Sequence, residues 1–501
     1  MRPLEILLFL VNLLTCVVVA VPLPRARRWM RYAALLALLI AVAQVLVEGP
    51  RWQLVPAYAL TGLCFLVWLV QHMARASRPA GPRRTKRRAA GLVAVGMSIL
   101  WLAVSMLLPL LVPVFRFTQP SGPYGIGTLT YHWVDAERRE IFSADPQARR
   151  ELMVQIWYPA KQDPATPRAS YVQDADALAL ALARLGHLPT FTFGHFRYVT
   201  TNAMPGAPVA ADEASYPVLL FLEGAIGFRQ MNTFQVEELV SHGYIVVAID
   251  QPSTAATVVF PDGREAAGLS VEQLRTLIRP SYIATDPAPV LNGMSLTDGS
   301  IIPYLAHDVR FTLDQLAALN QADPNGILTG RLDTTRVGTF GVSLGGIVVG
   351  EACLREPRLR ACLVMDAPMP SAVEQAGLRQ PSMWITRDAA TMRLERQRAG
   401  GWPEEEILAH QTTMRATFEN LRGDGYFVQV TDMFHVNLTD APYWSPLFSW
   451  LGVTGPINGQ RAHRIINAYS VAFFDQHLKN RPAALLDGPA GDYPEVRFES
   501  R

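Results

Sequence analysis

The sequence predicts a two-part chain, in which an all-α membrane region precedes an α/β region built on a mostly parallel sheet of about eight strands. Long apolar runs with almost no charge fill roughly the first 120 of the 501 positions. Beyond them, short β-branched or aromatic runs alternate with helical patterns, which is typical of strand-helix-strand units. Several later strands are apolar at nearly every position, as parallel strands covered by helices on both faces are.

Four apolar stretches in the N-terminal region approach the length of a transmembrane helix, which needs about 20 residues. They lie at roughly 4–22, 32–48, 54–72 and 90–115. We therefore expect residues 1–118 to form a four-span transmembrane region. Alternatively, residues 1–22 are a cleaved signal peptide, because this stretch ends in small residues near Ala20. Cleavage would leave the basic loop that follows on the outer side of the membrane.

Basic residues concentrate in two short loops between these stretches: Arg25, Arg27, Arg28 and Arg31 in the first, and Arg75, Arg78, Arg83, Arg84, Lys86, Arg87 and Arg88 in the second. Positive charge near span ends remains on the cytoplasmic side. We therefore expect an integral protein of the cell (inner) membrane, with everything after residue 116 on the extracytoplasmic side. A basic run also occurs in nucleic-acid-binding patches, but its place between two spans favours a topology signal, and no nucleic-acid partner is expected.

Cysteine usage indicates no metal site. Of the four cysteines, Cys16 and Cys64 lie in predicted spans, and Cys353 and Cys362 lie in the exported region. No CxxC or Cys/His ligand spacing occurs, so we expect neither a metal nor another cofactor. Because Cys353 lies in a predicted helix and Cys362 in a predicted strand, two buried free thiols are favoured over a disulfide.

Residues 119–501 contain the predicted sheet. The strands are expected at 125–133, 151–158, 216–222, 244–250, 335–341, 361–366, 382–387 and 425–431, and helices at about 231–241, 301–320, 344–355, 403–421 and 461–478. The segments near 160–210 and 252–300 lack a simple period and are rich in Pro, Thr and aromatic residues. We expect these two insertions to cap the sheet edge at which ligands bind, beyond the carboxyl ends of the strands.

A nucleophile motif stands between a predicted strand and a predicted helix. The segment Gly341-Val342-Ser343-Leu344-Gly345-Gly346 follows the strand VGTF and opens the helix IVVGEACL. A sharp strand-to-helix turn presents a serine hydroxyl to a base, and its glycines leave room where a Cβ would clash. This context predicts the α/β-hydrolase fold, with Ser343 as nucleophile.

The base and the acid must follow the serine in the chain. His435 comes immediately after the last predicted strand and is the expected base, whereas His410, His463 and His477 lie in helices and are expected to be solvated or to serve packing. Two aspartates end consecutive strands, Asp366 and Asp388, and either could orient an imidazole. The general fold more often uses the later strand, which favours Asp388.

An oxyanion requires two backbone N–H donors. Leu344, directly after the nucleophile, is expected to supply one of them. The second is expected from Ala225, in the glycine-containing loop 222–229 after the third predicted strand.

Several blocks in residues 120–480 resemble the platelet-activating factor acetylhydrolases of the plasma and type II intracellular kind and their bacterial relatives. They are GPYGIG at 122–127, REL at 150–152, VQIWYP at 154–159, GAIGFR at 224–229, SHGY at 241–244, VFPDG at 259–263, GVSLGG at 341–346, MDA at 365–367 and AFFD at 472–475. The resemblance implies a calcium-independent acyl hydrolase acting on phospholipids with short or oxidised acyl chains. Its triad falls on Ser343, Asp366 and His435, so the resemblance favours Asp366 as the acid, and its oxyanion donors fall on Ala225 and Leu344.

One departure from this family lies beside the expected oxyanion hole. Mammalian members carry His-Gly where this chain has Glu223-Gly224. An ionised carboxylate facing the oxyanion would oppose catalysis. Glu223 must therefore point away, be neutralised by a partner such as Arg229, or be protonated.

These residues predict a serine ester hydrolase that works through an acyl-enzyme, with a lipid or small ester as substrate and the membrane as its surroundings. A general short-chain carboxylesterase or an acyltransferase would use the same residues. A non-catalytic membrane sensor that binds ligands with the hydrolase fold is the alternative from a different class. The sequence indicates no oligomeric state.

Overall fold

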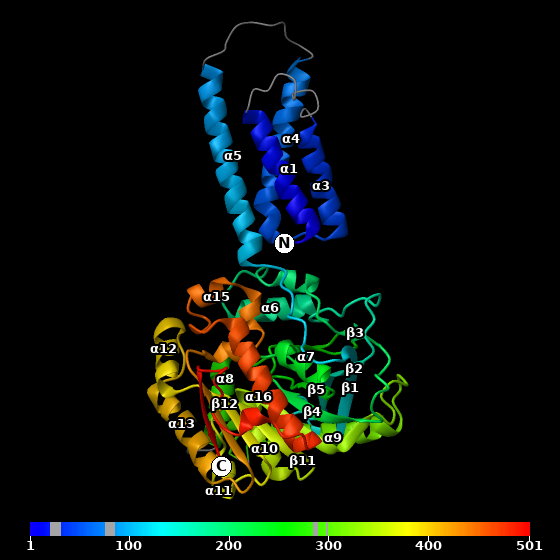
Figure 1. The fold of residues 1–501 in the computed structure, drawn as a ribbon, viewed down its shortest axis with the longest axis vertical. Coiled ribbons are helices and arrows are strands. Elements are labelled where there is room, and N and C mark those ends of the chain that lie inside the picture. Colours follow the sequence, from blue (N-terminus) through cyan, green and yellow to red (C-terminus); the bar gives the residue numbers. More distant parts are fainter. Residues whose placement is uncertain (21–31, 76–85, 284–288, 297–298) are drawn as a thin grey trace. The chain divides into compact units, whose positions relative to one another are not determined.

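The structure, a computed structural model, describes residues 1–20, 32–75, 86–283, 289–296 and 299–501. The chain divides into two compact units, traced by colour in Figure 1. The helical unit comprises Met1–Phe115 with Trp444–Pro446, and the sheet-containing unit comprises Arg116–Tyr443 with Leu447–Arg501.

The helical unit contains α1 (Pro3–Ala20), α3 (Ala33–Val47), the 3-10 turn η1 (Trp52–Leu54), α4 (Val55–Arg75) and α5 (Lys86–Leu111). Within the described residues, one helix is long and apolar enough to cross a bilayer, at Trp52–Val70, and apolar helices at Pro3–Val18, Ala33–Val47 and Gly96–Leu111 are shorter. One of the four expected spans thus meets this criterion, and the other three remain a prediction. The expected basic loops lie mostly outside the described residues.

Polar groups lie inside the helical unit, and large apolar groups lie on its surface. Glu5 and Arg51 are buried and form an ion pair of 2.8 Å, and the Asn12 side chain donates to the Thr61 hydroxyl at 2.9 Å. Leu46, in contrast, is 79% exposed, and many other large apolar side chains of this unit are also exposed. Membrane proteins place paired polar side chains between helices in this way.

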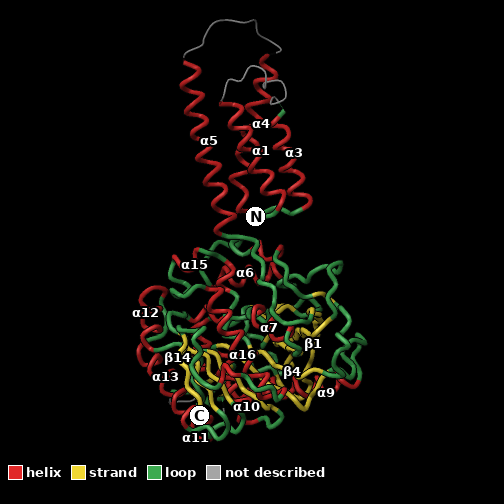
Figure 2. The backbone as a smooth tube through the Cα atoms, in the orientation of Figure 1, coloured by secondary structure: helices red, strands yellow, loops and turns green. Residues whose placement is uncertain are grey.

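The second unit is built on one large sheet, drawn in yellow in Figure 2. Within the described residues this sheet has ten strands, in the order β14-β13-β12-β11-β10-β4-β5-β2-β1-β3. They are β1 (Gly125–Arg139), β2 (Arg149–Ala160), β3 (Met204–Pro205), β4 (Tyr216–Leu222), β5 (Ile245–Asp250), β10 (Leu332–Val342), β11 (Leu359–Met365), β12 (Ser382–Thr386), β13 (Gly425–Val430) and β14 (Val496–Ser500).

Strands β5, β4, β10, β11, β12 and β13 lie side by side in this order and are parallel to one another, whereas β2 is antiparallel to β5 and β14 is antiparallel to β13. This arrangement confirms the predicted α/β-hydrolase class. All eight predicted strands are present, and β3 and β14 are two further edge strands that the sequence analysis missed. Short polar segments such as β14, with the sequence VRFES, give little apolar signal because one edge of the strand faces solvent.

Helices cover both faces of the sheet, because the side chains of each strand alternate between them. Val218, Leu220 and Leu222 of β4 pack in one core with residues of α9 (Ile302–Gln321), α10 (Leu344–Arg355) and α13 (Glu404–Glu419). Leu219 and Phe221 pack in the other core with α7 (Thr233–Ser241) and α16 (Gly459–Lys479). These five helices match the helical patterns of the sequence.

The two expected insertions contain short regular elements. The first holds α6 (Ala175–Leu185), the 3-10 helix η2 (Gly194–Tyr198) and β3. The second holds the hairpin β6 (Thr257–Val259) and β7 (Glu265–Ala267), then α8 (Val271–Ile278), η3 (Arg279–Ser281), β8 (Val290–Leu291) and β9 (Met294–Ser295). Helix α8 begins where Ser270 and Gln273 cap it reciprocally.

The prediction of free thiols at Cys353 and Cys362 is wrong. Cys353 and Cys362 form a disulfide, with their Cα atoms 6.6 Å apart. Helix α10, which carries Cys353, packs against β11, which carries Cys362. A helix residue and a strand residue can therefore come within disulfide reach when the connection returns the chain directly to the adjacent strand.

Candidate active site

Ser343 lies in a sharp turn between β10 and α10. Its backbone has φ 57° and ψ −121°, a conformation that residues other than glycine rarely adopt and that is typical of a nucleophile elbow. The turn needs glycine at position 345, because a Cβ there would lie 2.0 Å from the Leu222 carbonyl oxygen. Ser343 is partly exposed, while its neighbours Val342 and Leu344 are buried.

The structure brings Asp366 and His435 together. Asp366 follows β11 with a φ of 47°, and His435 begins the 3-10 helix η4 (His435–Leu438) after β13. The His435 Nδ1 and the Asp366 Oδ2 are 2.6 Å apart. Asp388 instead caps α12 (Ala389–Ala399), where its carboxylate accepts the Thr391 N–H at 2.7 Å. The geometry thus pairs the predicted base with Asp366 and gives Asp388 a different task.

Three more side chains surround the Asp366 carboxylate. Arg387, which follows β12 and is fully buried, donates its Nε–H to Oδ2 at 2.7 Å. Thr386 donates its hydroxyl to Oδ1 at 3.1 Å, and the His410 Nε2 lies 3.7 Å from the same oxygen. Burial opposes ionisation of Asp366, but the charge of Arg387 and the hydrogen bond from His435 outweigh it and hold the pKa of this carboxyl well below its usual range.

The sequence analysis missed Arg387. Of the two expectations for His410, solvation is wrong because His410 is buried, whereas packing agrees with the stacking of its ring on Trp402. A signal for Arg387 existed, because a charged residue directly follows an apolar strand at the sheet edge where ligands bind.

The loop after β4 lies next to Ser343. A Cβ on Gly224 would be 3.2 Å from the Ser343 Cβ. The loop is held by the Ile226 N–H, which donates to the Thr254 carbonyl at 2.6 Å, and Ile226 itself has a φ of 55°. Ala225 is therefore in a fixed loop beside the serine, and Leu344 is the first residue of α10, where free N–H groups favour negative charge.

Glu223 is buried, and the structure distinguishes the three expectations for it. Its Oε1 accepts the Gln251 N–H at 2.9 Å. Burial, together with the nearby Asp250, raises the pKa of Glu223 well above its ordinary value. Arg229 does not neutralise Glu223, because its side chain is paired with Asp250. The raised pKa favours the protonated form of Glu223, which carries no charge.

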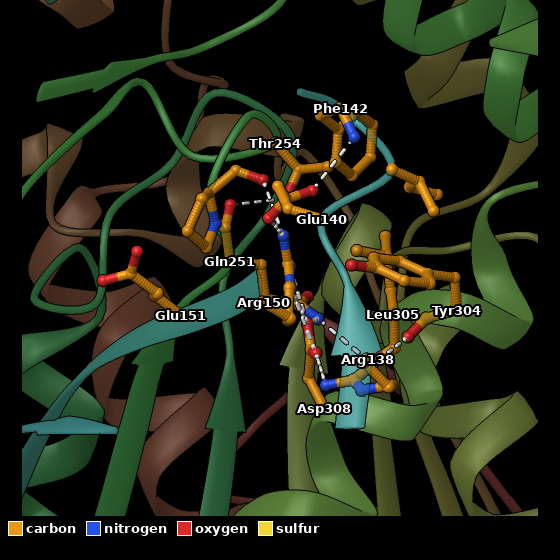
Figure 3. A network of polar contacts seen from close by, with 12 residues as sticks. Arg138, Glu140, Phe142, Arg150, Glu151, Gln251, Thr254, Tyr304, Leu305 and Asp308 are labelled. Atoms are coloured by element: carbon orange, nitrogen blue, oxygen red, sulfur yellow. Dashed lines mark hydrogen bonds and ion pairs between the residues drawn. The ribbon is translucent and has the colours of Figure 1, made fainter. Parts of the chain in front are cut away.

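A buried polar network, drawn in Figure 3, contacts this loop through Gln251. Arg150 binds Asp308 at 2.7 Å and Glu140 at 2.8 Å, and Arg138 also pairs with Asp308. The Gln251 side chain donates to the Asp308 Oδ2 at 2.8 Å, while its backbone N–H holds Glu223. The network therefore connects the β1–β2 hairpin to the loop next to Ser343.

Metal-ligating residues do not gather at this site. Across the described ranges, no group of three or more His, Cys, Asp or Glu side chains could hold a metal ion.

Comparisons with known proteins find similarity to esterases. A sequence model of the family "Platelet-activating factor acetylhydrolase, isoform II" matches residues 114–278. The chain is related to the platelet-activating factor acetylhydrolases. A probable 1-alkyl-2-acetylglycerophosphocholine esterase of Arthroderma benhamiae is 24% identical over 415 residues, which cover 77% of this chain and 94% of that protein. The platelet-activating factor acetylhydrolase of Cavia porcellus is 22% identical over a match that covers 72% of this chain and 77% of that protein.

A solved structure extends the likeness to the fold of an esterase. The ferulic acid esterase from Streptomyces cinnamoneus superposes with a TM-score of 0.57 at 26% identity, and the match covers 77% of this chain and 99% of that one. This relative of the acetylhydrolases is a carboxylic ester hydrolase. The alternative of a non-catalytic sensor is therefore not supported.

Proposed function

We propose that the enzyme is a serine acyl hydrolase in which Ser343, His435 and Asp366 form the catalytic triad. The observation that carries this proposal is the 2.6 Å contact between the His435 Nδ1 and Asp366, at the same sheet edge as the strained turn of Ser343. An ionised Asp366 fixes the tautomer in which the His435 Nε2 is free to take a proton.

The proposed reaction has two steps. The His435 Nε2 removes the proton of Ser343 as the serine oxygen attacks the ester carbonyl, and the alcohol leaves with that proton. Water, activated by the same imidazole, then hydrolyses the acyl-enzyme and releases the acid. The Ala225 and Leu344 N–H groups are the proposed donors to the oxyanion of each step. A protonated Glu223 adds no negative charge beside them.

For the substrate, we propose phospholipids or similar lipids with short or oxidised acyl esters, cleaved without calcium. The names of the relatives from Arthroderma benhamiae and Cavia porcellus support this class. A general short-chain carboxylesterase is the second candidate, because the similar solved structure is a ferulic acid esterase. Rates on short-acyl phospholipids, p-nitrophenyl esters and feruloyl esters, each with and without a calcium chelator, separate the two. An acyl product that appears only with an added alcohol would indicate acyl transfer instead.

Labelling of the purified, detergent-solubilised protein with a fluorophosphonate tests the nucleophile. We expect the wild type to be labelled and Ser343→Ala to be neither labelled nor active. Ser371→Ala, at the start of α11 (Ser371–Ala376), is a matched control that should be labelled fully. Hydrolysis by Ser343→Ala at the wild-type rate would refute the mechanism.

We also propose that residues 1–118 anchor the enzyme in the cell membrane and that the catalytic unit is extracytoplasmic. The apolar helix at Trp52–Val70 supports the anchor, and the Cys353–Cys362 disulfide supports an oxidising compartment. Alkaline phosphatase fused after residue 501 should be active if this orientation is correct, whereas a fluorescent protein that matures only in the cytoplasm should stay dark. A bright fluorescent fusion with inactive phosphatase would reverse the orientation.

A further inference from the structure

The His435 imidazole and the Arg387 guanidinium share one oxygen of the Asp366 carboxylate. The Oδ2 atom lies 2.6 Å from the His435 Nδ1 and 2.7 Å from the Arg387 Nε. Both Asp366 and Arg387 have fully buried side chains, so water does not screen their interaction. In a triad, the carboxylate stabilises the imidazolium that forms during acyl transfer. A permanent positive charge on the same oxygen weakens that stabilisation.

The other end of Arg387 contacts a second carboxylate. Its Nη1 donates to the Glu395 Oε2, and the Glu395 Oε1 accepts the backbone N–H of His435 at 3.2 Å. The guanidinium also lies over the Trp402 ring, 4.9 Å from its centroid, and this ring packs edge-on against the His435 ring with centroids 4.9 Å apart. Asp366, Arg387, Glu395 and His435 thus form a closed ring of polar contacts with Trp402 against it.

Four elements carry the titratable groups that lie around His435. The end of β11 brings Asp366, the end of β12 brings Arg387, and helix α12 brings Glu395. Helix α13 adds His410, which stacks on Trp402 and whose pKa is lowered to about 4 by burial, so that it is neutral in the working range. Two carboxylates and one guanidinium therefore lie around His435: Asp366 contacts its ring, Glu395 accepts its backbone N–H, and Arg387 binds both carboxylates.

We propose that Arg387 and Glu395 are opposed positioning residues that set the pH range of the enzyme: Arg387 weakens, and Glu395 strengthens, the stabilisation of the protonated His435. This inference rests on the proposed triad. An enzyme with Arg387 keeps its base unprotonated to lower pH than a bare Asp-His pair would. The second task of Arg387 is to orient the acid, because its Nε–H and the Thr386 hydroxyl fix the two oxygens of Asp366.

The two roles predict shifts of opposite sign in the pH profile. A charge within about 4–6 Å moves a titration by roughly 1–3 pH units when it is buried. Arg387→Met keeps much of the length of the side chain but removes its charge, and should move the acidic limb of the kcat/KM profile to higher pH by about one pH unit. Glu395→Gln should move this limb to lower pH by a smaller amount, because Glu395 is partly exposed. KM should change little in either variant.

The experiment is the pH profile of kcat/KM for p-nitrophenyl acetate, measured on the full-length, detergent-solubilised enzyme. Arg387→Lys restores the charge and should return the limb to the wild-type position, even if kcat stays reduced. Arg393→Met is the matched control, because Arg393 lies on the same α12 helix but pairs with Glu404 at the surface. Its profile should superpose on that of the wild type.

Limbs that shift in the same direction for Arg387→Met and Glu395→Gln, or that do not move, would overturn the inference. If Arg387→Met does not fold, Glu395→Gln alone decides, because an unmoved or raised limb contradicts the predicted fall. The proposed triad and the proposed role of Arg387 and Glu395 can be refuted separately. Activity that survives in Ser343→Ala removes the triad, whereas an essential Ser343 with unmoved limbs removes only the role of Arg387 and Glu395.

Discussion

Exchange of the two candidate acids for asparagine discriminates between them. Asp366→Asn keeps the shape of the side chain but no longer binds His435 as an anion, so the imidazole loses its fixed tautomer. The equivalent change in the serine protease triad lowers kcat by about 10,000-fold. We expect a loss of that order here. Asp388→Asn should leave kcat within about twofold, because Asn caps a helix as well as Asp does.

The same pair of variants predicts a difference in stability. Asp366→Asn removes one partner of the buried Arg387, and removal of one member of a buried ion pair costs roughly 3–5 kcal/mol. Glu395 still binds Arg387, so the lower end of that range applies. The depressed pKa of Asp366 means that its contribution is present above about pH 4, the ordinary value, and is lost as pH falls below it. The gap in Tm between wild type and Asp366→Asn should therefore be widest at neutral pH and narrow in acid.

The assay is hydrolysis of p-nitrophenyl acetate, combined with thermal unfolding of the wild type and each variant from about pH 2 to pH 8, which includes the range below pH 4 where the gap should narrow. A kcat of Asp366→Asn within tenfold of the wild type would refute the assignment. So would a loss for Asp388→Asn as large as the one predicted for Asp366→Asn.

Three further changes test the surroundings of the site. Gly345→Ala should lower Tm and abolish activity, because its Cβ would overlap the Leu222 carbonyl oxygen, whereas Gly194→Ala meets no atom within 4 Å and should be neutral in both assays. Glu223→Gln mimics the protonated carboxyl and should keep most of kcat. Because the pKa of Glu223 is raised in the folded state, the stability that its protonation contributes is full below about pH 4.3 and is lost as the pH rises. Glu223→Gln does not titrate, so its Tm should exceed that of the wild type between pH 5 and 8. An equal or lower Tm at pH 8 would contradict a protonated Glu223. Simultaneous Cys353→Ala and Cys362→Ala should cost about 2–3 kcal/mol through loss of the closed loop, and an unchanged Tm would show that the disulfide contributes nothing.

The parts of the fold that could be predicted are those with local causes. The elbow of Ser343 needs only a strand, a glycine pattern and a helix that follow one another in the chain, so the sequence contains the whole signal. Strand β4 is apolar throughout, and β5 and β11 are apolar except for Asp250 and Arg360, because both faces of these strands are covered. Edge strand β14 lacks such a signal because only its pairing with β13 defines it.

The sequence analysis left open whether His410 is solvated or packed, although the sequence contained the periodicity that decides between the two. Helix α13 is polar on average, which suggested an exposed helix, but its buried residues recur at helical spacing: Glu406, Ile407, His410, Thr413, Met414, Thr417 and Phe418. His410 lies on that inner stripe. The prediction of free thiols at Cys353 and Cys362 was wrong for a different reason. The packing of α10 on β11 is a tertiary contact that neither element encodes alone.

The role proposed for Arg387 depends on sheet order, which the sequence does not state. Neighbouring parallel strands β10, β11, β12 and β13 each end at the same edge of the sheet. The ends of these strands carry Ser343, Asp366, Arg387 and His435 in that order. When the acid follows β11, the end of β12 lies between the acid and the base, at the position where the general fold more often has its acid. An arginine at this position cannot act as an acid, but it can bind one. The same strand order therefore explains why Asp388 is left to cap a helix and why Arg387 is the residue best placed to adjust the charge on Asp366.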